Sequence, residues 1–193
     1  MKYILMAGTT GNPIRQLTKI NGEIILERTI RLLKENGVED IAVTSMNPAF
    51  DKYNRIEYDS SGPWVNCFLP VYDPCCYIMG DVYFSPKAIK TIVNTETDSI
   101  EFFASAPPFA ENYPKRWAEP FAFKVVDQER FREAIEKTKQ LYNSGYLHRC
   151  IAWELWQVIK GTELNHIDYT NYTVINDYSC DIDYPGDEKQ WTF

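Results

Sequence analysis

Two short apolar runs near the amino terminus flank an amphipathic stretch. Residues 3–7 (YILMA) are apolar at successive positions, and residues 41–45 (IAVTS) begin with three apolar residues, a pattern typical of strands buried on both faces. Between them, apolar residues recur at helical spacing from Gly22 to Lys34, and Gly37 follows where such a helix would end. This order of strand, helix and strand predicts a βαβ unit and a largely parallel sheet.

Further elements follow along the chain. We expect a strand over 75–84 broken at Gly80–Asp81, helices over 87–93, from 127 to just before 145 and over 151–160, a strand at 172–175 and an acidic, turn-like tail from Asp181. The stretch 105–123 is rich in aromatic residues and proline and fits no regular element. It predicts an irregular excursion of the kind that often carries function in compact domains.

Composition and charge narrow the class of protein. With 193 residues and 45% hydrophobic content, the chain can form one domain, 1–193, with a full core. The net charge of −7 argues against a nucleic-acid surface, and a phosphorylated ligand would need local cations or a metal. The five cysteines contain no C-x-x-C pair and there are only two histidines, so we expect reduced thiols, no structural zinc and a cytoplasmic protein.

No segment of the sequence predicts a membrane anchor. The opening MKYILMAG is too short for the apolar region of a signal peptide, and no apolar run reaches the ~20 residues of a membrane span. We therefore expect no membrane partner and no nucleic-acid partner. The composition is compatible with either a monomer or a homodimer.

The loop after the first strand, AGTTGNPIR, combines features of an anion site. Gly8 and Gly11 let backbone N–H groups approach an anion, Thr9 and Thr10 offer hydroxyl donors, and Arg15 adds a fork-shaped cation before the helix. Neither a Walker loop nor a dinucleotide fingerprint is present. On these residues alone, a tight turn with a solvated Arg15 is as good an interpretation as a phosphate site.

Three segments together resemble one enzyme family. Residues 3–43 are similar to the amino-terminal signature of the nucleotidyltransferases that make activated sugars or activated choline, through Leu5, Ala7, Gly8, Gly11, Arg15, Asn21, Gly22, Leu26, Glu27 and Arg28. YIMGDVYFSPKAI (77–89) resembles the family's strand ending in Gly-Asp, and CDIDYPGDEKQW (180–191) resembles its closing motif. The resemblance implies a three-layer, Rossmann-like (GT-A-like) α/β fold with a mostly parallel mixed sheet.

The resemblance also implies a reaction. A nucleoside monophosphate, CMP being favoured, would pass from a nucleoside triphosphate to a small phosphorylated acceptor such as a sugar phosphate or phosphocholine, with release of pyrophosphate. Asp81 and Asp183 would hold Mg²⁺, because carboxylates suit this ion and the family's metal positions match them. Taken alone, Asp81 reads as a turn residue and Asp183 as part of a solvated tail, with Asp181 or Asp187 as alternatives in register.

The remaining site residues follow from the same resemblance. Arg15 and Lys19 would bind the phosphates of the triphosphate, and residues 7–11 (Ala7, Gly8, Thr9, Thr10, Gly11) would contact the nucleotide. YDSSGPWVNCF (58–68) matches more weakly and makes Asn66 a candidate for the base or the acceptor, although a turn asparagine is the simpler interpretation. The excursion offers Lys115, Arg116, Trp117, Glu119 and Lys124 for the acceptor; each could instead fill the core or lie in water.

Two other classes stay open. A nucleotide-sugar glycosyltransferase of similar fold would need an Asp-x-Asp in mid-chain, and the only such motif, 181–183, comes too late. A non-catalytic nucleotide-binding relative is suggested by the segment from Arg15 to Asn21, which is shorter than in the family. Release of pyrophosphate separates the transferase from both.

Overall fold

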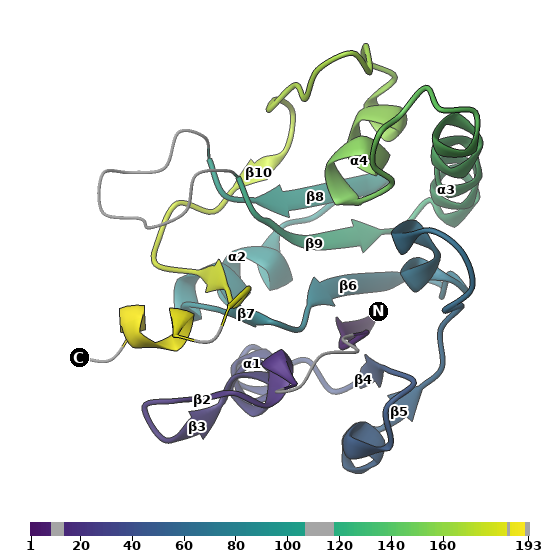
Figure 1. The fold of residues 1–193 in the computed structure, drawn as a ribbon. Helices are drawn as coiled ribbons and strands as arrows, with labels where there is room; N and C mark the ends of the chain where they lie inside the picture. The colour runs from purple at the N-terminus through teal and green to yellow at the C-terminus, as the bar shows by residue number, and fades with distance from the viewer. Residues whose placement is uncertain (9–13, 107–117, 185, 192–193) are drawn as a thin grey trace.

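A seven-stranded sheet forms the centre of the computed structural model, which describes residues 1–8, 14–106, 118–184 and 186–191 (Figure 1). Its strands lie in the order β10-β8-β9-β6-β1-β4-β5. Their bounds are β1 Lys2–Met6, β4 Ile41–Thr44, β5 Arg55–Ile56, β6 Cys75–Met79, β8 Ile100–Ala104, β9 Pro120–Val125 and β10 Thr173–Val174.

The sheet is mixed and mostly parallel, as expected. β1 pairs in parallel with β4 and β6, so that Leu5 lies between Val43 and Ile78, and only β9 runs against its neighbours, β6 and β8. Because β1, β4 and β6 run the same way, the segments that follow them meet at one edge of the sheet.

Two strands of the central sheet, β8 and β9, were not predicted from the sequence. The interpretation of 105–123 as wholly irregular is wrong at its end, because β9 begins at Pro120, and β8 over Ile100–Ala104 was not predicted. Proline is tolerated as the first residue of a strand, where its missing N–H costs no ladder bond. Both strands carry phenylalanines that are buried in the core.

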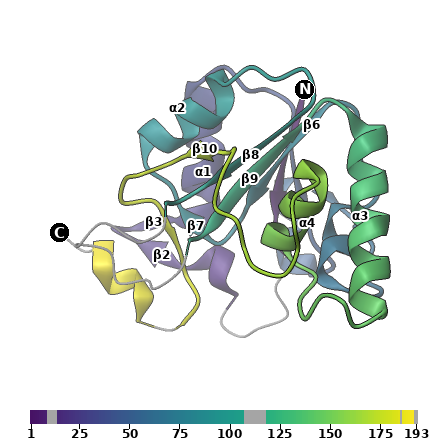
Figure 2. The same ribbon diagram turned by 90° about the horizontal axis from the view of Figure 1, so that it is seen from above.

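Helices cover both faces of the sheet, which confirms the three-layer arrangement. Figure 2 shows α1 (Ile25–Glu35) and α2 (Pro86–Asn94) on one face, and α3 (Gln128–Asn143) and α4 (Ala152–Lys160) on the other. The helix predicted from Gly22 begins only at Ile25, whereas the predicted start of α2 is confirmed, because the Ser85 side chain accepts a hydrogen bond from Ala88 N at 2.9 Å. None of the helices within the described residues is long and apolar enough to cross a membrane.

Short elements at the strand-end edge complete the fold. Three single turns of 3-10 helix (η1 Arg15–Leu17, η2 Pro48–Tyr53, η3 Trp64–Phe68) accompany a hairpin of β2 (Lys19–Ile20) and β3 (Glu23–Ile24). Asn21 and Gly22 form its turn with φ of 50° and 84°, the left-handed conformation that these two residue types adopt most readily.

The carboxyl-terminal segment is more regular than expected. β11 (Cys180–Asp181) pairs antiparallel with β7 (Val82–Tyr83), and a short 3-10 helix, η4 (Asp187–Trp191), follows. The expectation of a turn-like tail from Asp181 is therefore wrong at its start. Figure 1 shows this yellow segment beside β7 and the β2–β3 hairpin.

Candidate functional site

The ends of β1 and β6 lie unusually close together. Gly80 N donates to Met6 O at 3.0 Å, and a Cβ on Gly80 would collide with that same carbonyl oxygen. Only glycine therefore fits at this position. The contact fixes Gly8, which follows β1, and Asp81, which follows β6, on one side of the sheet edge.

The β7–β11 pairing brings the two predicted metal-binding aspartates together. Ile182 N donates to Asp81 O at 2.9 Å, so Asp183 lies one residue beyond a direct backbone contact with Asp81. Arg15 Nη1 lies 3.4 Å from Asp183 Oδ1 and 4.0 Å from Asp81 Oδ2. Residues about a hundred positions apart thus form one cluster around the arginine that the first loop supplies.

A small hydrophobic cluster outside the main core holds Asp183 in place. It consists of Ile20, Ile25, Tyr83, Cys180, Ile182 and Trp191. The Asp187 carboxylate also accepts hydrogen bonds from Asp183 N and Tyr184 N, each at 2.9 Å. Because the β2–β3 hairpin contributes Ile20, the shortened segment after Arg15 helps to support the acidic cluster.

A pocket of about 510 Å³, here called the strand-end pocket, opens beside this cluster. Its lining includes Gly8, Arg15, Tyr58, Asp59, Trp64 and Asp81. The Tyr58 hydroxyl donates to Gly8 O at 3.4 Å and so lies over the backbone of Gly8. Backbone and a cation on one side and an aromatic side chain on the other suit a ligand with both an anionic and a planar part.

A second pocket of about 370 Å³, here called the α4 pocket, lies next to the first. Its lining includes Trp64, Glu119, Arg149, Trp153, Tyr169 and Asp183. Trp64 is common to both pockets, and Asp81 and Asp183 each line one of them. The acidic cluster therefore lies at the boundary between two pockets, which is the position needed by a group that acts on two ligands at once.

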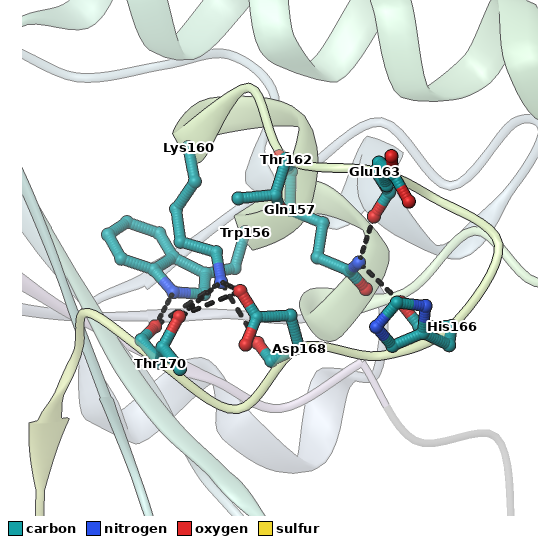
Figure 3. Close-up of polar contacts among 8 residues, drawn as sticks. All are labelled: Trp156, Gln157, Lys160, Thr162, Glu163, His166, Asp168 and Thr170. Atoms are coloured by element: carbon teal, nitrogen blue, oxygen red, sulfur yellow. Dashed lines mark hydrogen bonds and ion pairs between the residues drawn. The ribbon is translucent and has the colours of Figure 1, made fainter.

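A polar network joins α4 to the segment that follows it (Figure 3), and Tyr169 of this segment lines the α4 pocket. Lys160 Nζ is buried and donates to Asp168 O at 2.9 Å, to Asp168 Oδ2 at 3.2 Å and to Thr170 O at 3.3 Å. Gln157 Nε2 donates to the carbonyl oxygens of Glu163 and His166, both at 2.7 Å. Side chains of α4 thus satisfy backbone groups of a segment without regular structure.

The same network positions an aromatic wall. Tyr169 lies between the two residues that Lys160 binds, and its ring meets the Trp153 ring edge-on at 4.8 Å between centroids. Trp153 Nε1 in turn donates to Ala118 O at 3.0 Å, which ties α4 to the start of β9. The aromatic side of the α4 pocket is therefore built by long-range contacts.

Three carboxylates gather in the wall of the α4 pocket. Glu119, Asp181 and Asp183 each have an oxygen within 4.8 Å of the others. Together with Asp81, they offer only hard oxygen donors, which match Mg²⁺ or Ca²⁺ better than a softer metal. The donor set thus fits the magnesium expected from sequence, with Asp81 and Asp183 accompanied by two carboxylates that the resemblance did not assign to the metal.

Several predicted residues do not reach the cluster. Lys19 is exposed in β2 and lines neither pocket; its charge instead helps to lower the pKa of Glu27. Asn66 is buried beneath the strand-end pocket, where its Nδ2 donates to Asp59 Oδ2 at 2.9 Å. Ala7 is buried, and only its neighbour Gly8 lines the pocket.

Lys124 lies away from the site. It pairs with Cys76 at the opposite end of β6, and its Nζ donates to the carbonyl oxygens of Val93 at 3.0 Å and Thr95 at 2.7 Å. Burial lowers the pKa of this lysine. Its position closes the carboxyl end of α2, so the expected role in the acceptor site does not fit the structure. Thr9, Thr10, Gly11, Lys115, Arg116 and Trp117 lie outside the described residues.

Two ionisable side chains that line the strand-end pocket, Asp59 and Cys67, have pKa values shifted in opposite directions. Hydrogen bonds from the Ser61 hydroxyl and backbone N–H lower the pKa of Asp59, so that this carboxylate stays charged. Burial raises the pKa of the Cys67 thiol well above its ordinary value. The pocket therefore presents a stable negative charge and an unreactive thiol.

Sequence reasoning missed Tyr58, Trp64, Arg149 and Tyr169. Tyr58 and Trp64 belong to the segment 58–68 that resembles the family, but the resemblance made only Asn66 of this segment a candidate ligand. Arg149 and Tyr169 carried no local signal, since only the packing of α4 on β9 brings them to the cluster.

Comparisons with known proteins identify the fold. No family model matches the sequence, and no curated protein matches it either. Among solved structures, a 4-diphosphocytidyl-2C-methyl-D-erythritol synthase from Anaerococcus prevotii has 13% identity and a TM-score of 0.60, over 98% of this chain and 95% of its own. A glucose-1-phosphate thymidylyltransferase from Bacillus anthracis, so described provisionally, has 13% identity and a TM-score of 0.58, over 93% and 89%. The chain thus shares the fold of these enzymes, which confirms the fold expected from the resemblance.

Proposed function

We propose that this protein is a Mg²⁺-dependent nucleotidyltransferase that transfers a nucleoside monophosphate from a nucleoside triphosphate to a small phosphorylated acceptor. The observation that carries the proposal is the meeting of Asp81, Asp183 and Arg15 at the boundary between two pockets. A transfer between two bound ligands needs this arrangement, because both must reach one cluster of charges.

The strand-end pocket is the proposed nucleotide site. Gly8 would face the nucleotide, Arg15 would bind its phosphates, and Tyr58 or Trp64 would face the base. CTP is the favoured donor because the helix entry resembles the choline-phosphate cytidylyltransferases. The name of the Anaerococcus enzyme is consistent with a cytidine nucleotide. The name of the Bacillus enzyme indicates a thymidine nucleotide, so dTTP is also tested as a donor.

The α4 pocket is the proposed acceptor site. An oxygen of the acceptor's phosphate would attack the α-phosphorus of the triphosphate. The bond from that phosphorus to the oxygen bridging to the β-phosphate would break, and pyrophosphate would leave with the electron pair. When bound at Asp81 and Asp183, a divalent cation would neutralise phosphate charge; Arg15 would add the protein's own positive charge on the nucleotide side.

The acceptor's body would meet aromatic and acidic side chains. Trp64, Trp153 and Tyr169 offer flat surfaces for a sugar or a quaternary ammonium, and Glu119 offers an acceptor for hydroxyl groups. These features favour a sugar phosphate or phosphocholine over an apolar phosphomonoester. We place the protein in the cytoplasm, supplying activated units for a surface polymer or a lipid head group.

A release assay tests the proposal. Pyrophosphate is measured with CTP, UTP, dTTP or ATP against sugar 1-phosphates, phosphocholine and related phosphomonoesters, with Mg²⁺ and with excess EDTA. We expect one donor–acceptor pair to release pyrophosphate, and EDTA to abolish the signal. Release of free nucleotide without pyrophosphate from a nucleotide-sugar would point to the glycosyltransferase, and binding without either product would point to the non-catalytic relative.

A further inference from the structure

Arg149 is held in an unusual way at the rim of the α4 pocket. Its Nε donates to Glu154 Oε1 at 2.9 Å, and the Glu154 side chain is only 7% exposed, whereas the Arg149 side chain is 56% exposed. A buried carboxylate thus orients the guanidinium from its inner side. The two terminal nitrogens donate no hydrogen bond to any described residue, so the N–H groups of both stay available to a ligand in the pocket that Arg149 lines.

The surroundings of Arg149 select the kind of ligand. The same pocket is lined by Glu119, Asp181 and Asp183, and Arg149 is the one cation among its described lining residues. Three carboxylates would repel an anionic ligand unless a cation stood opposite them. A guanidinium with two free, parallel N–H donors matches the oxygens of a phosphate in a bidentate contact.

We infer that Arg149 binds the phosphate of the acceptor and that Glu154 acts as its positioning residue. This inference rests on the proposed function for the identity of the ligand, but the binding of a phosphomonoester can be measured without it. The two arginines then divide the work: Arg15 serves the strand-end pocket, and Arg149 serves the α4 pocket. Ile151 and Ala152, at the start of α4, line the same wall and add the positive end of the helix dipole.

Binding is tested first without chemistry. Fluorescence of Trp64 and Trp153, which line the pocket, or calorimetry would follow titration with phosphocholine and glucose 1-phosphate, and with choline and glucose, with and without a non-hydrolysable CTP analogue. We expect a phosphomonoester to bind more tightly than its dephosphorylated counterpart. Arg149→Gln should weaken that binding about ten- to a hundredfold, since it removes a charge-assisted bidentate contact, and Arg149→Lys should weaken it less.

Matched variants keep the result interpretable. Arg149→Gln leaves the buried Glu154 carboxylate without its partner, which can destabilise the fold. The double variant Arg149→Gln/Glu154→Gln removes both charges and so controls for this loss of stability. Arg132→Gln is the control, because Arg132 is exposed on α3 and acts on Cys75 at the opposite edge of the sheet. Glu154→Gln should raise the acceptor KM a few-fold while kcat and the CTP KM stay unchanged, a split that general loosening of the fold would not give.

The outcomes separate the inference from the proposed function. If pyrophosphate is released and Arg149→Gln leaves the acceptor KM and phosphomonoester binding unchanged, or alters the CTP KM instead, the inference is wrong and the function stands. If no pair releases pyrophosphate but Arg149 still governs phosphomonoester binding, the anion site stands and the function is wrong. If neither release nor binding is seen in the wild type, both are wrong.

Discussion

The strand-end pocket and the α4 pocket are neighbours built in different ways. The strand-end pocket gathers at the carboxyl ends of the parallel strands β1, β4 and β6, and Gly8 brings backbone into its wall. The α4 pocket is made by side chains from an antiparallel strand, a helix start and the carboxyl-terminal segment. Under the proposed function, the sheet edge would supply a general cradle for the nucleotide, and the packing around it would supply a specific site for the acceptor.

The largest effect is expected where the two pockets meet. Asp183→Asn should lower the rate of pyrophosphate release by about a hundredfold or more, since even indirect supports of a metal site cost ten- to a hundredfold. The melting temperature should change little, because both side chains of the pair with Arg15 are partly exposed to solvent. Asp98→Asn, exposed at the opposite edge before β8, is the control. Retention of more than a third of the activity would contradict the assignment.

A second test concerns the backbone at the ends of β1 and β6, beside the strand-end pocket. Gly80→Ala should lower the free energy of unfolding by about 1–3 kcal/mol, because the new Cβ meets the Met6 carbonyl, which cannot move without disturbing β1. Gly8→Ala should cost less, since its Cβ would meet the Tyr58 hydroxyl at 3.1 Å and that side chain can turn. Urea unfolding of both variants decides the matter, and equal losses would refute this account of the edge.

A third test asks whether the pockets can be disturbed separately. Lys160→Met removes the cation that fixes Asp168 and Thr170, and should raise the acceptor KM about three- to tenfold with little change in the CTP KM. Trp64→Ala should raise both values, because Trp64 lines both pockets.

Steady-state kinetics over both substrates supply the measurement for this pair. Lys137→Met, on the exposed side of α3, controls for loss of a lysine. An equal rise of both KM values in Lys160→Met would show that the segment after α4 does not serve the acceptor alone.

The smallest effect is expected at two thiols, one near each pocket. Burial raises the pKa of Cys67, which lines the strand-end pocket, and of Cys150, which lies between Arg149 and Ile151 of the α4 pocket. A raised thiol pKa reduces the fraction of reactive thiolate at neutral pH. Iodoacetamide should therefore modify both slowly, faster as pH rises, and CTP should protect Cys67 alone. Rapid labelling at pH 7 would contradict the burial of these groups.

The contrast between the pockets also explains what the sequence could predict. Two features could be predicted from residues close together in the chain: the strand–helix–strand pattern and the break at Gly80–Asp81. The first follows from the spacing of hydrophobic residues and the second from the presence of turn-forming residues. Asp183 became a candidate only through resemblance to a family. No local pattern links it to Asp81, and the short β7–β11 pairing that joins them was not visible.

Other features were hidden because packing alone creates them. The irregular interpretation of 105–123 missed β9, since the prolines of the stretch outweighed the short apolar run that follows Pro120. Lys124 was predicted to bind the acceptor because it is a cation near aromatic residues. It lies in β9, where successive side chains point to opposite faces of the sheet, and its side chain contacts the carboxyl end of α2. Arg149 and Tyr169 could not be assigned until α4 was placed against β9.

The small hydrophobic cluster around Trp191 affects the order in which the protein loses activity and unfolds. It acts as a latch: it lies apart from the main core and, together with the β7–β11 pairing and the Asp187 carboxylate, keeps Asp183 beside Asp81. Few contacts resist its opening, so mild heat or low urea can release it while the sheet stays intact. Inactivation should then precede the collapse of tertiary structure, and a bound substrate pair that bridges both aspartates would hold the latch shut.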